Sequence, residues 1–192
     1  MKNLKLIALL VIPTLFLTSC NNDDDNTTVP VNEEEVITTV RVTLIGGGQT
    51  IVLESRDLDG DGPNAPVLTP IGGGNLTAGT TYTGSTTFLN ELENPAEDIT
   101  VEVEEEGADH QVFYQLASSI GTLTYDAADI DANGNPIGLD FTLVAGTSGS
   151  TGTLTVTLRH LPNKTASGVA GGDITNAGGN TDAAVSFPIV VN

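Results

Sequence analysis

The sequence predicts an all-β protein, a single antiparallel β-sandwich of the immunoglobulin-like type with about eight to ten strands. Two observations carry this prediction. From Val36 onward, apolar and polar residues alternate in segments rich in Thr, Val, Ile and Leu, and each segment is bounded by Gly, Pro, Asn or Asp. No stretch shows a helical repeat longer than a turn or two. Residues 36–192 are numerous enough to form one domain with a hydrophobic core.

The predicted strands follow one another along this domain. They are residues 36–45, 50–55, 80–89, 98–104, 111–117, 121–126, 138–145, 152–160 and 183–191. In the segment 152–160, Leu154, Val156 and Leu158 alternate with polar residues, so one face should pack in the core and the other should face water. The segment 98–104 has the same pattern, with Ile99, Val101 and Val103 expected on the core face.

The N-terminus has the pattern of a bacterial lipoprotein signal. Residues 1–19 contain two lysines and an apolar run that is too short to span a membrane, which is typical of a secretory signal peptide. The residues Leu17-Thr18-Ser19-Cys20 resemble a lipobox, in which the Cys becomes the lipidated N-terminus. We therefore expect Cys20 to carry a lipid anchor that attaches the protein to a membrane.

Residues 20–35 predict an acidic, flexible tether. This segment contains three consecutive aspartates and three consecutive glutamates and almost no large apolar residue, so it cannot bury enough surface to fold. An acidic run just after the lipidated Cys also resembles the export signal that sends lipoproteins of Bacteroidota to the cell surface. We expect an outer-membrane lipoprotein exposed at the surface.

The composition disfavours several functions. The formal net charge of −19 repels phosphate backbones, so nucleic acid is not an expected partner, whereas cations are. No nucleophile motif such as G-x-S-x-G surrounds either histidine, and the chain has no Trp and few other aromatic residues to form sugar subsites. We therefore expect a protein that is not an enzyme.

The segment 129–140 matches the spacing of a calcium-binding loop. Such a loop has oxygen ligands at positions 1, 3 and 5, Gly at 6, a backbone carbonyl at 7 and a carboxylate at 12. Those positions hold Asp129, Asp131, Asn133, Gly134, Asn135 and Asp140. The Asp at position 12 is shorter than the usual Glu, so calcium affinity should be weak. A plain hairpin turn at Asn133-Gly134 explains the same residues without a metal ion.

A second acidic segment, residues 57–62, repeats the first half of this pattern. Asp57, Asp59 and Asp61 have the same spacing and Gly62 follows them. Three carboxylates this close repel one another unless a cation or water separates them. A further ligand would have to come from another loop, and an Asp/Gly-rich turn is again the alternative.

The two histidines offer a different kind of metal site. His110 and His160 lie at the ends of predicted strands and share parity with the core residues of those strands. If the strands are adjacent and antiparallel, the imidazoles meet at one rim of the sandwich, near Glu105 and Asp109. Imidazole and carboxylate together suit zinc. The alternative is a rim histidine that is hydrogen-bonded to a neighbouring carboxylate.

Several segments together resemble a family of short surface lipoproteins from marine Bacteroidota. They are the lipobox and residues 33–44, 57–62, 94–114, 153–164 and 181–191. Such proteins are often labelled "type 1 periplasmic binding fold superfamily", which implies a two-lobed α/β receptor. The chain shows no alternation of strands and helices that could build one. The resemblance suggests an association with TonB-dependent uptake receptors, and it carries over no catalytic residue.

These observations predict a lipoprotein that binds cations or a small nutrient ligand, with calcium at the Asp-rich loops and zinc at the histidines. Such a protein could serve an uptake receptor at the cell surface. A structural or adhesive surface module without a dedicated ligand is the alternative, since a bare sandwich with an acidic surface is sufficient for it.

Overall fold

The computed structural model describes residues 35–60, 62–70 and 73–192, all of which belong to one unit, Glu34–Asn192. The predicted signal peptide, Cys20 and the tether up to residue 34 lie outside the described residues, as does Asp61. Within the described part of the chain, no helix has the length and apolar character needed to cross a membrane.

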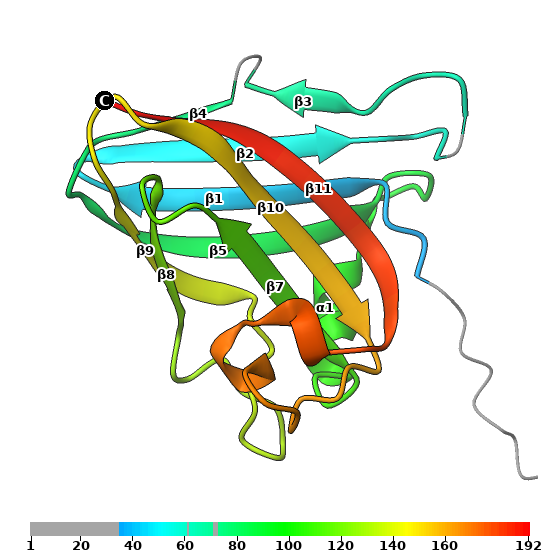
Figure 1. Ribbon diagram of the computed structural model, residues 1–192. Helices are drawn as coiled ribbons and strands as arrows, with labels where there is room; N and C mark the ends of the chain where they lie inside the picture. Colours follow the sequence, from blue (N-terminus) through cyan, green and yellow to red (C-terminus); the bar gives the residue numbers. More distant parts are fainter. Residues whose placement is uncertain (1–34, 61, 71–72) are drawn as a thin grey trace, which may run out of the picture. The chain divides into compact units, whose positions relative to one another are not determined.

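Two β-sheets pack face to face and confirm the predicted all-β sandwich (Figure 1). The first sheet contains β1 (Thr39–Gly46), β2 (Gln49–Arg56), β3 (Val67–Thr69), β5 (Thr81–Asn90), β6 (Glu97–Asp98), β8 (Gly121–Tyr125) and β9 (Asp140–Ala145), in the order β3-β2-β1-β5-β9-β8 with β6 beside β5. The second sheet contains β4 (Gly74–Leu76), β7 (His110–Leu116), β10 (Thr151–His160) and β11 (Asn180–Val191), in the order β4-β11-β10-β7. The strands of the second sheet cross those of the first obliquely in Figure 1.

The core lies between the sheets and follows the alternation in the sequence. Leu154, Val156 and Leu158 of β10 are buried as predicted. The ring of Phe141 packs against Tyr114 and lies so close to Gly84 that a Cβ there would collide with it. A glycine in the middle of β5 therefore makes room for a core aromatic ring.

One predicted strand is wrong: most of the segment 98–104 forms the short helix α1 (Ile99–Glu105). Asp98 caps the helix by accepting a hydrogen bond from the backbone N–H of Thr100 (3.1 Å). Ile99 and Val103 are buried, whereas Val101 between them is 50% exposed. Apolar residues at every second position also include a pair four residues apart, so the same letters fit both a strand and a helical turn.

The outer face of the second sheet is covered near one end, which the alternation did not predict. The segment between β10 and β11, which contains the 3-10 helices η1 (Val169–Gly171) and η2 (Ile174–Asn176), folds over β7 and β10 (Figure 1). Val169 and Ala177 from this segment form a small second core with Phe113 of β7. The covering segment begins just after His160, the last residue of β10, and the backbone N–H of Asn163 donates to the carbonyl of Ala177 within it.

Paired substitutions in α1 test the helix against the strand. Val103→Ala should lower the free energy of unfolding by about 2 kcal/mol, because Val103 is fully buried. Val101→Ala makes the same change at an exposed position and should alter it by less than about 0.5 kcal/mol. Urea unfolding of both variants measures the difference. Equal losses would contradict the helix, because a strand would bury both side chains.

Candidate metal centre

The pairing of β7 with β10 brings the two histidines together. The strands are antiparallel, and His110 lies directly opposite His160 in the register. Their rings stack with centroids 4.6 Å apart and an interplanar angle of 24°. Both histidines are buried. The expected meeting of the two imidazoles at one end of the sheet is thus confirmed.

Two carboxylates complete a cluster with these rings. Glu35, His110, His160 and Asp182 each offer one ligand atom, and these four atoms lie within 4.8 Å of one another. Glu35 and Asp182 have side chains that are only 4% and 1% exposed. This corrects the predicted carboxylates: Glu105 and Asp109 are exposed and do not belong to the cluster.

A β-bulge places Asp182 in the cluster. The register between β10 and β11 pairs Leu158 with Ala183 but Arg159 with Thr181, so Asp182 lies at the shift in register. Ala183 packs against the core, and in a regular strand its neighbour Asp182 would point to the opposite face. The bulge redirects the side chain, as bulges near functional sites do.

Glu35 was predicted to end the tether, residues 20–35, but it belongs to the folded unit Glu34–Asn192. Its Oε1 lies 2.9 Å from Nε2 of His110. Its Oε2 is buried and has no hydrogen-bond partner among the described residues. A buried oxygen in this state costs free energy, so the position of Glu35 calls for an explanation beyond packing.

His110 has an acceptor at each ring nitrogen. Nδ1 lies 3.3 Å from the backbone carbonyl of Glu106, and Nε2 lies 2.9 Å from the Glu35 carboxylate. A neutral imidazole has one N–H and can donate to only one of them. A metal ion at Nε2 would take the place of the second proton, while Nδ1–H keeps its bond to the carbonyl and fixes the tautomer.

His160 presents a ring nitrogen with no partner. Its Nδ1 is buried and makes no hydrogen bond to any described residue, although the side chain is packed beside His110. The chain approaches His160 closely at Gly179, where φ is +70° and a Cβ would collide with the His160 carbonyl. The backbone around His160 is therefore closely packed, and its free nitrogen is held in a fixed place.

The structure does not bring together the ligands of the predicted calcium loop 129–140. Oδ1 of Asp131 accepts the backbone N–H groups of Asn133 and Asn135 at 2.8 and 2.9 Å. Oδ2 of Asp129 accepts the N–H of Asp140 at 2.9 Å, and the position-7 carbonyl of Asn135 accepts the N–H of Asp131. These bonds close the segment on itself as a turn.

A lysine from outside the loop pairs with Asp131, one of the predicted ligands. Nζ of Lys164 donates to Oδ2 of Asp131 (3.1 Å), to the carbonyl of Pro136 (3.0 Å) and to the carbonyl of Gly107. Carboxylate and carbonyl oxygens around a positive charge are the surroundings that calcium also takes. The ammonium group is thus the counter-ion of the Asp131 carboxylate.

Burial and pairing shift the pKa values of Asp131 and Lys164 in opposite directions. Burial raises the pKa of the Asp131 carboxyl, but hydrogen bonds from Asn135, Lys164 and the Asn133 backbone outweigh it and leave the pKa below 3.8. Burial lowers the pKa of Lys164, and the attraction of Asp131 offsets this only in part. The attraction between the two groups favours the charged form of each, so each ion depends on the other.

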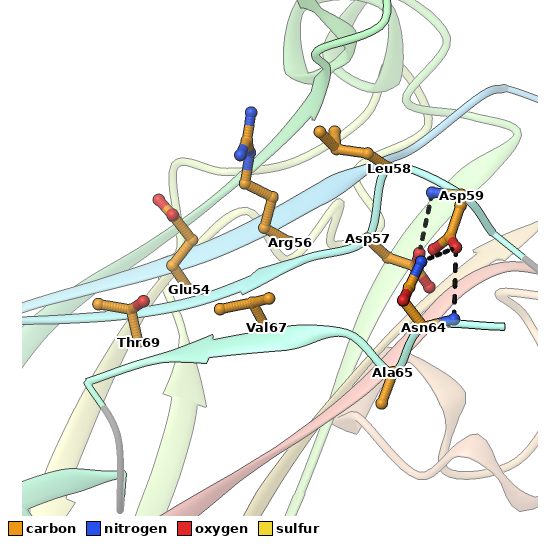
Figure 2. Close-up of a pocket in the computed structure, with 9 residues that line it drawn as sticks. All are labelled: Glu54, Arg56, Asp57, Leu58, Asp59, Asn64, Ala65, Val67 and Thr69. Atoms are coloured by element: carbon orange, nitrogen blue, oxygen red, sulfur yellow. Dashed lines mark hydrogen bonds between the residues drawn. The ribbon is translucent and has the colours of Figure 1, made fainter. Parts of the chain in front are cut away.

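The second acidic loop lies beside a surface hollow of about 480 Å³ next to β2 and β3, shown in Figure 2. Asp59 accepts hydrogen bonds from the backbone and side chain of Asn64, and its own N–H donates to Asp57. Both described carboxylates are thus bonded within the loop. Among the described residues, neither belongs to a group of converging metal ligands.

Comparison with models of known protein families gave no match, and searches of curated proteins and of solved structures gave no significant match either.

The Lys164–Asp131 pair provides a stability test. Lys164→Met should lower the free energy of unfolding by about 3 kcal/mol or more, because it leaves a buried carboxylate without its counter-ion. The double variant Lys164→Met with Asp131→Leu removes both charges and should recover most of this loss. Urea unfolding measures both variants. A single variant as stable as the wild type would show that the pair contributes nothing.

The lowered pKa of Asp131 sets a pH dependence. Its contribution to stability should be fully present above 3.8, the ordinary value, and should be lost as the pH falls through the lower pKa of the folded state. The stability difference between the wild type and Asp131→Asn should therefore be constant near neutral pH and shrink in acid. Unfolding curves at a series of pH values measure it, and a difference that grows in acid would refute the assignment.

Proposed function

We propose that this protein binds a transition-metal cation, with zinc the best fit, through Glu35, His110, His160 and Asp182. The observation that supports this most strongly is His110, whose two ring nitrogens both face acceptors. A neutral imidazole can donate to only one of these acceptors, whereas a cation bound at Nε2 would interact favourably with the Glu35 carboxylate. The positive charge of the cation would also balance the buried negative charge of Glu35.

The donor set agrees with zinc. The two imidazole nitrogens favour zinc and its neighbours over calcium or magnesium, and zinc also accepts carboxylate oxygens as its remaining ligands. Ligand atoms around a tetrahedral zinc lie roughly 3.3 Å apart, so binding would draw the four side chains inward from their present separations of up to 4.8 Å. Bound metal should therefore tighten this end of the second sheet.

The number of protein ligands favours binding over catalysis. Four protein ligands fill a tetrahedral shell, whereas catalytic zinc sites keep one position for water or substrate. The four side chains are also buried or nearly so, which limits access for a substrate. We infer a protein that holds the metal and is not an enzyme.

The N-terminal pattern and the net charge suggest where in the cell the protein binds metal ions. A lipid on Cys20 would anchor the protein at the outer membrane, and the acidic surface would raise the local concentration of cations. We propose capture of metal ions at the cell surface, in the service of a TonB-dependent uptake receptor.

A pair of double variants with equal charge changes tests the site. Glu35→Gln with Asp182→Asn should weaken zinc binding at least about tenfold, because even residues that only support metal ligands contribute 10–100-fold. Glu105→Gln with Asp109→Asn removes the same charge from exposed positions outside the cluster and should leave binding unchanged. Isothermal titration of the purified protein with zinc measures both.

The histidines provide a second measurement. His160→Gln should abolish stoichiometric zinc binding and the stabilisation that zinc confers, which for the wild type is about 2.7 kcal/mol at a hundredfold excess over Kd. Circular dichroism checks that the variant remains folded. Zinc binding that is equal in the wild type and His160→Gln, or absent from the wild type, would overturn the proposal.

A further inference from the structure

Glu35 is a member of two clusters of metal-ligating side chains. Besides the histidine cluster, it forms a group with Glu102 and Glu106, whose ligand atoms also lie within 4.8 Å of one another. Glu102 and Glu106 are exposed and lie four residues apart, so both project from the same face of α1. The buried carboxylate of Glu35 thus belongs both to a buried cluster and to an exposed one.

Glu35 has one buried carboxylate oxygen that makes no hydrogen bond to a described residue. Oε1 is engaged by His110, while Oε2 is buried without a hydrogen-bond partner in the described part of the chain, and the side chain as a whole is 4% exposed. A carboxylate has room for ligands on both oxygens. One oxygen can serve the histidine cluster and the other can serve the cluster on α1.

The end of α1 concentrates negative charge at this place. Glu106 is the C-cap residue, so the partial negative charge of the helix C-terminus adds to the carboxylates. Like charges four residues apart destabilise a helix unless a cation lies between them. Desolvation and the neighbouring Glu35 and Glu106 carboxylates raise the pKa of Glu102, which reflects the same crowding.

We propose that Glu35, Glu102 and Glu106 form a second cation subsite, which binds calcium and shares Glu35 with the zinc site. The sharing rests on the function proposed above, whereas the calcium subsite stands on its own ligands. All three ligands are carboxylate oxygens, which suit a hard cation. Calcium–oxygen distances of about 2.3–2.6 Å allow two ligands to lie up to roughly 4.6–5.2 Å apart, and the three ligand atoms all lie within 4.8 Å of one another.

The two subsites are linked by more than Glu35. The side chain of Glu106 belongs to the calcium subsite, and its backbone carbonyl accepts from Nδ1 of His110. The C-terminal turn of α1 therefore supports both metal ions. Calcium expected at the Asp-rich loops is assigned instead to this helix, where the carboxylate oxygens converge.

Equilibrium dialysis against millimolar calcium tests this subsite. Glu102→Gln with Glu106→Gln should weaken calcium binding at least about tenfold and leave zinc binding unchanged. The matched control, Glu104→Gln with Glu105→Gln, removes two charges from the same helix outside the cluster and should bind calcium as the wild type does. Glu35→Gln should weaken both metals, and His160→Gln should weaken zinc alone.

The outcomes separate the two proposals. Calcium binding that persists in Glu102→Gln/Glu106→Gln, or is lost instead in Asp57→Asn/Asp59→Asn, overturns the subsite on α1, as does a wild type that binds no calcium. Calcium binding that depends on Glu102 and Glu106, in a protein that binds no zinc, upholds the subsite and overturns the shared zinc site. Full loss in the Glu104→Gln/Glu105→Gln control would show a general effect of charge and overturn the subsite.

Discussion

The antiparallel register of β7 and β10 is the constraint on which the candidate metal centre depends. Backbone hydrogen bonds between the two strands fix His110 opposite His160, and buried residues such as Leu154 and Leu158 oppose a slip of one residue. A slip of one residue would move the apolar face of β10 into water and would turn His160 away from its partner. The core and the site are therefore specified by the same pairing.

The protein has few lysine and arginine side chains. After the first five residues the chain has only four basic side chains. Arg41 and Arg56 pair with surface carboxylates, and Lys164 is buried against Asp131. An internal ammonium ion thus stabilises one acidic turn, whereas the histidine cluster combines carboxylates with imidazole nitrogens. The two arrangements illustrate two ways of stabilising buried carboxylates.

The two clusters around Glu35 differ in burial and in ligand type, and this difference determines which cation suits each. Nitrogen donors and a dry environment favour a transition metal in the inner cluster. Oxygen donors at the surface favour a hard, partly hydrated cation on α1. Because Glu35 contributes to both, the first described residue of the domain connects the surface of α1 with the end of the second sheet.

The sequence by itself determined the sandwich and most of its strands, because a period of two dictates which side chains can face a core. Parity also placed the two histidines on one face. The pattern failed at α1, since Ile99 and Val103 satisfy a strand and a helical turn alike, and only the Asp98 cap signalled the helix. In the loop 129–140, ligand spacing gave no sign of Lys164, which comes from a distant segment and pairs with Asp131.

Tertiary structure alone decided which carboxylates join the histidines. Glu35 and Asp182 are distant from both in sequence, and Asp182 reaches the cluster through a bulge that no local pattern announces. Spacing along a chain reports contacts within one element, whereas a site assembled from β7, β10, β11 and the segment before β1 depends on how those elements pack. The sequence predicted that histidines and carboxylates would meet, and only the fold showed that the carboxylates are Glu35 and Asp182.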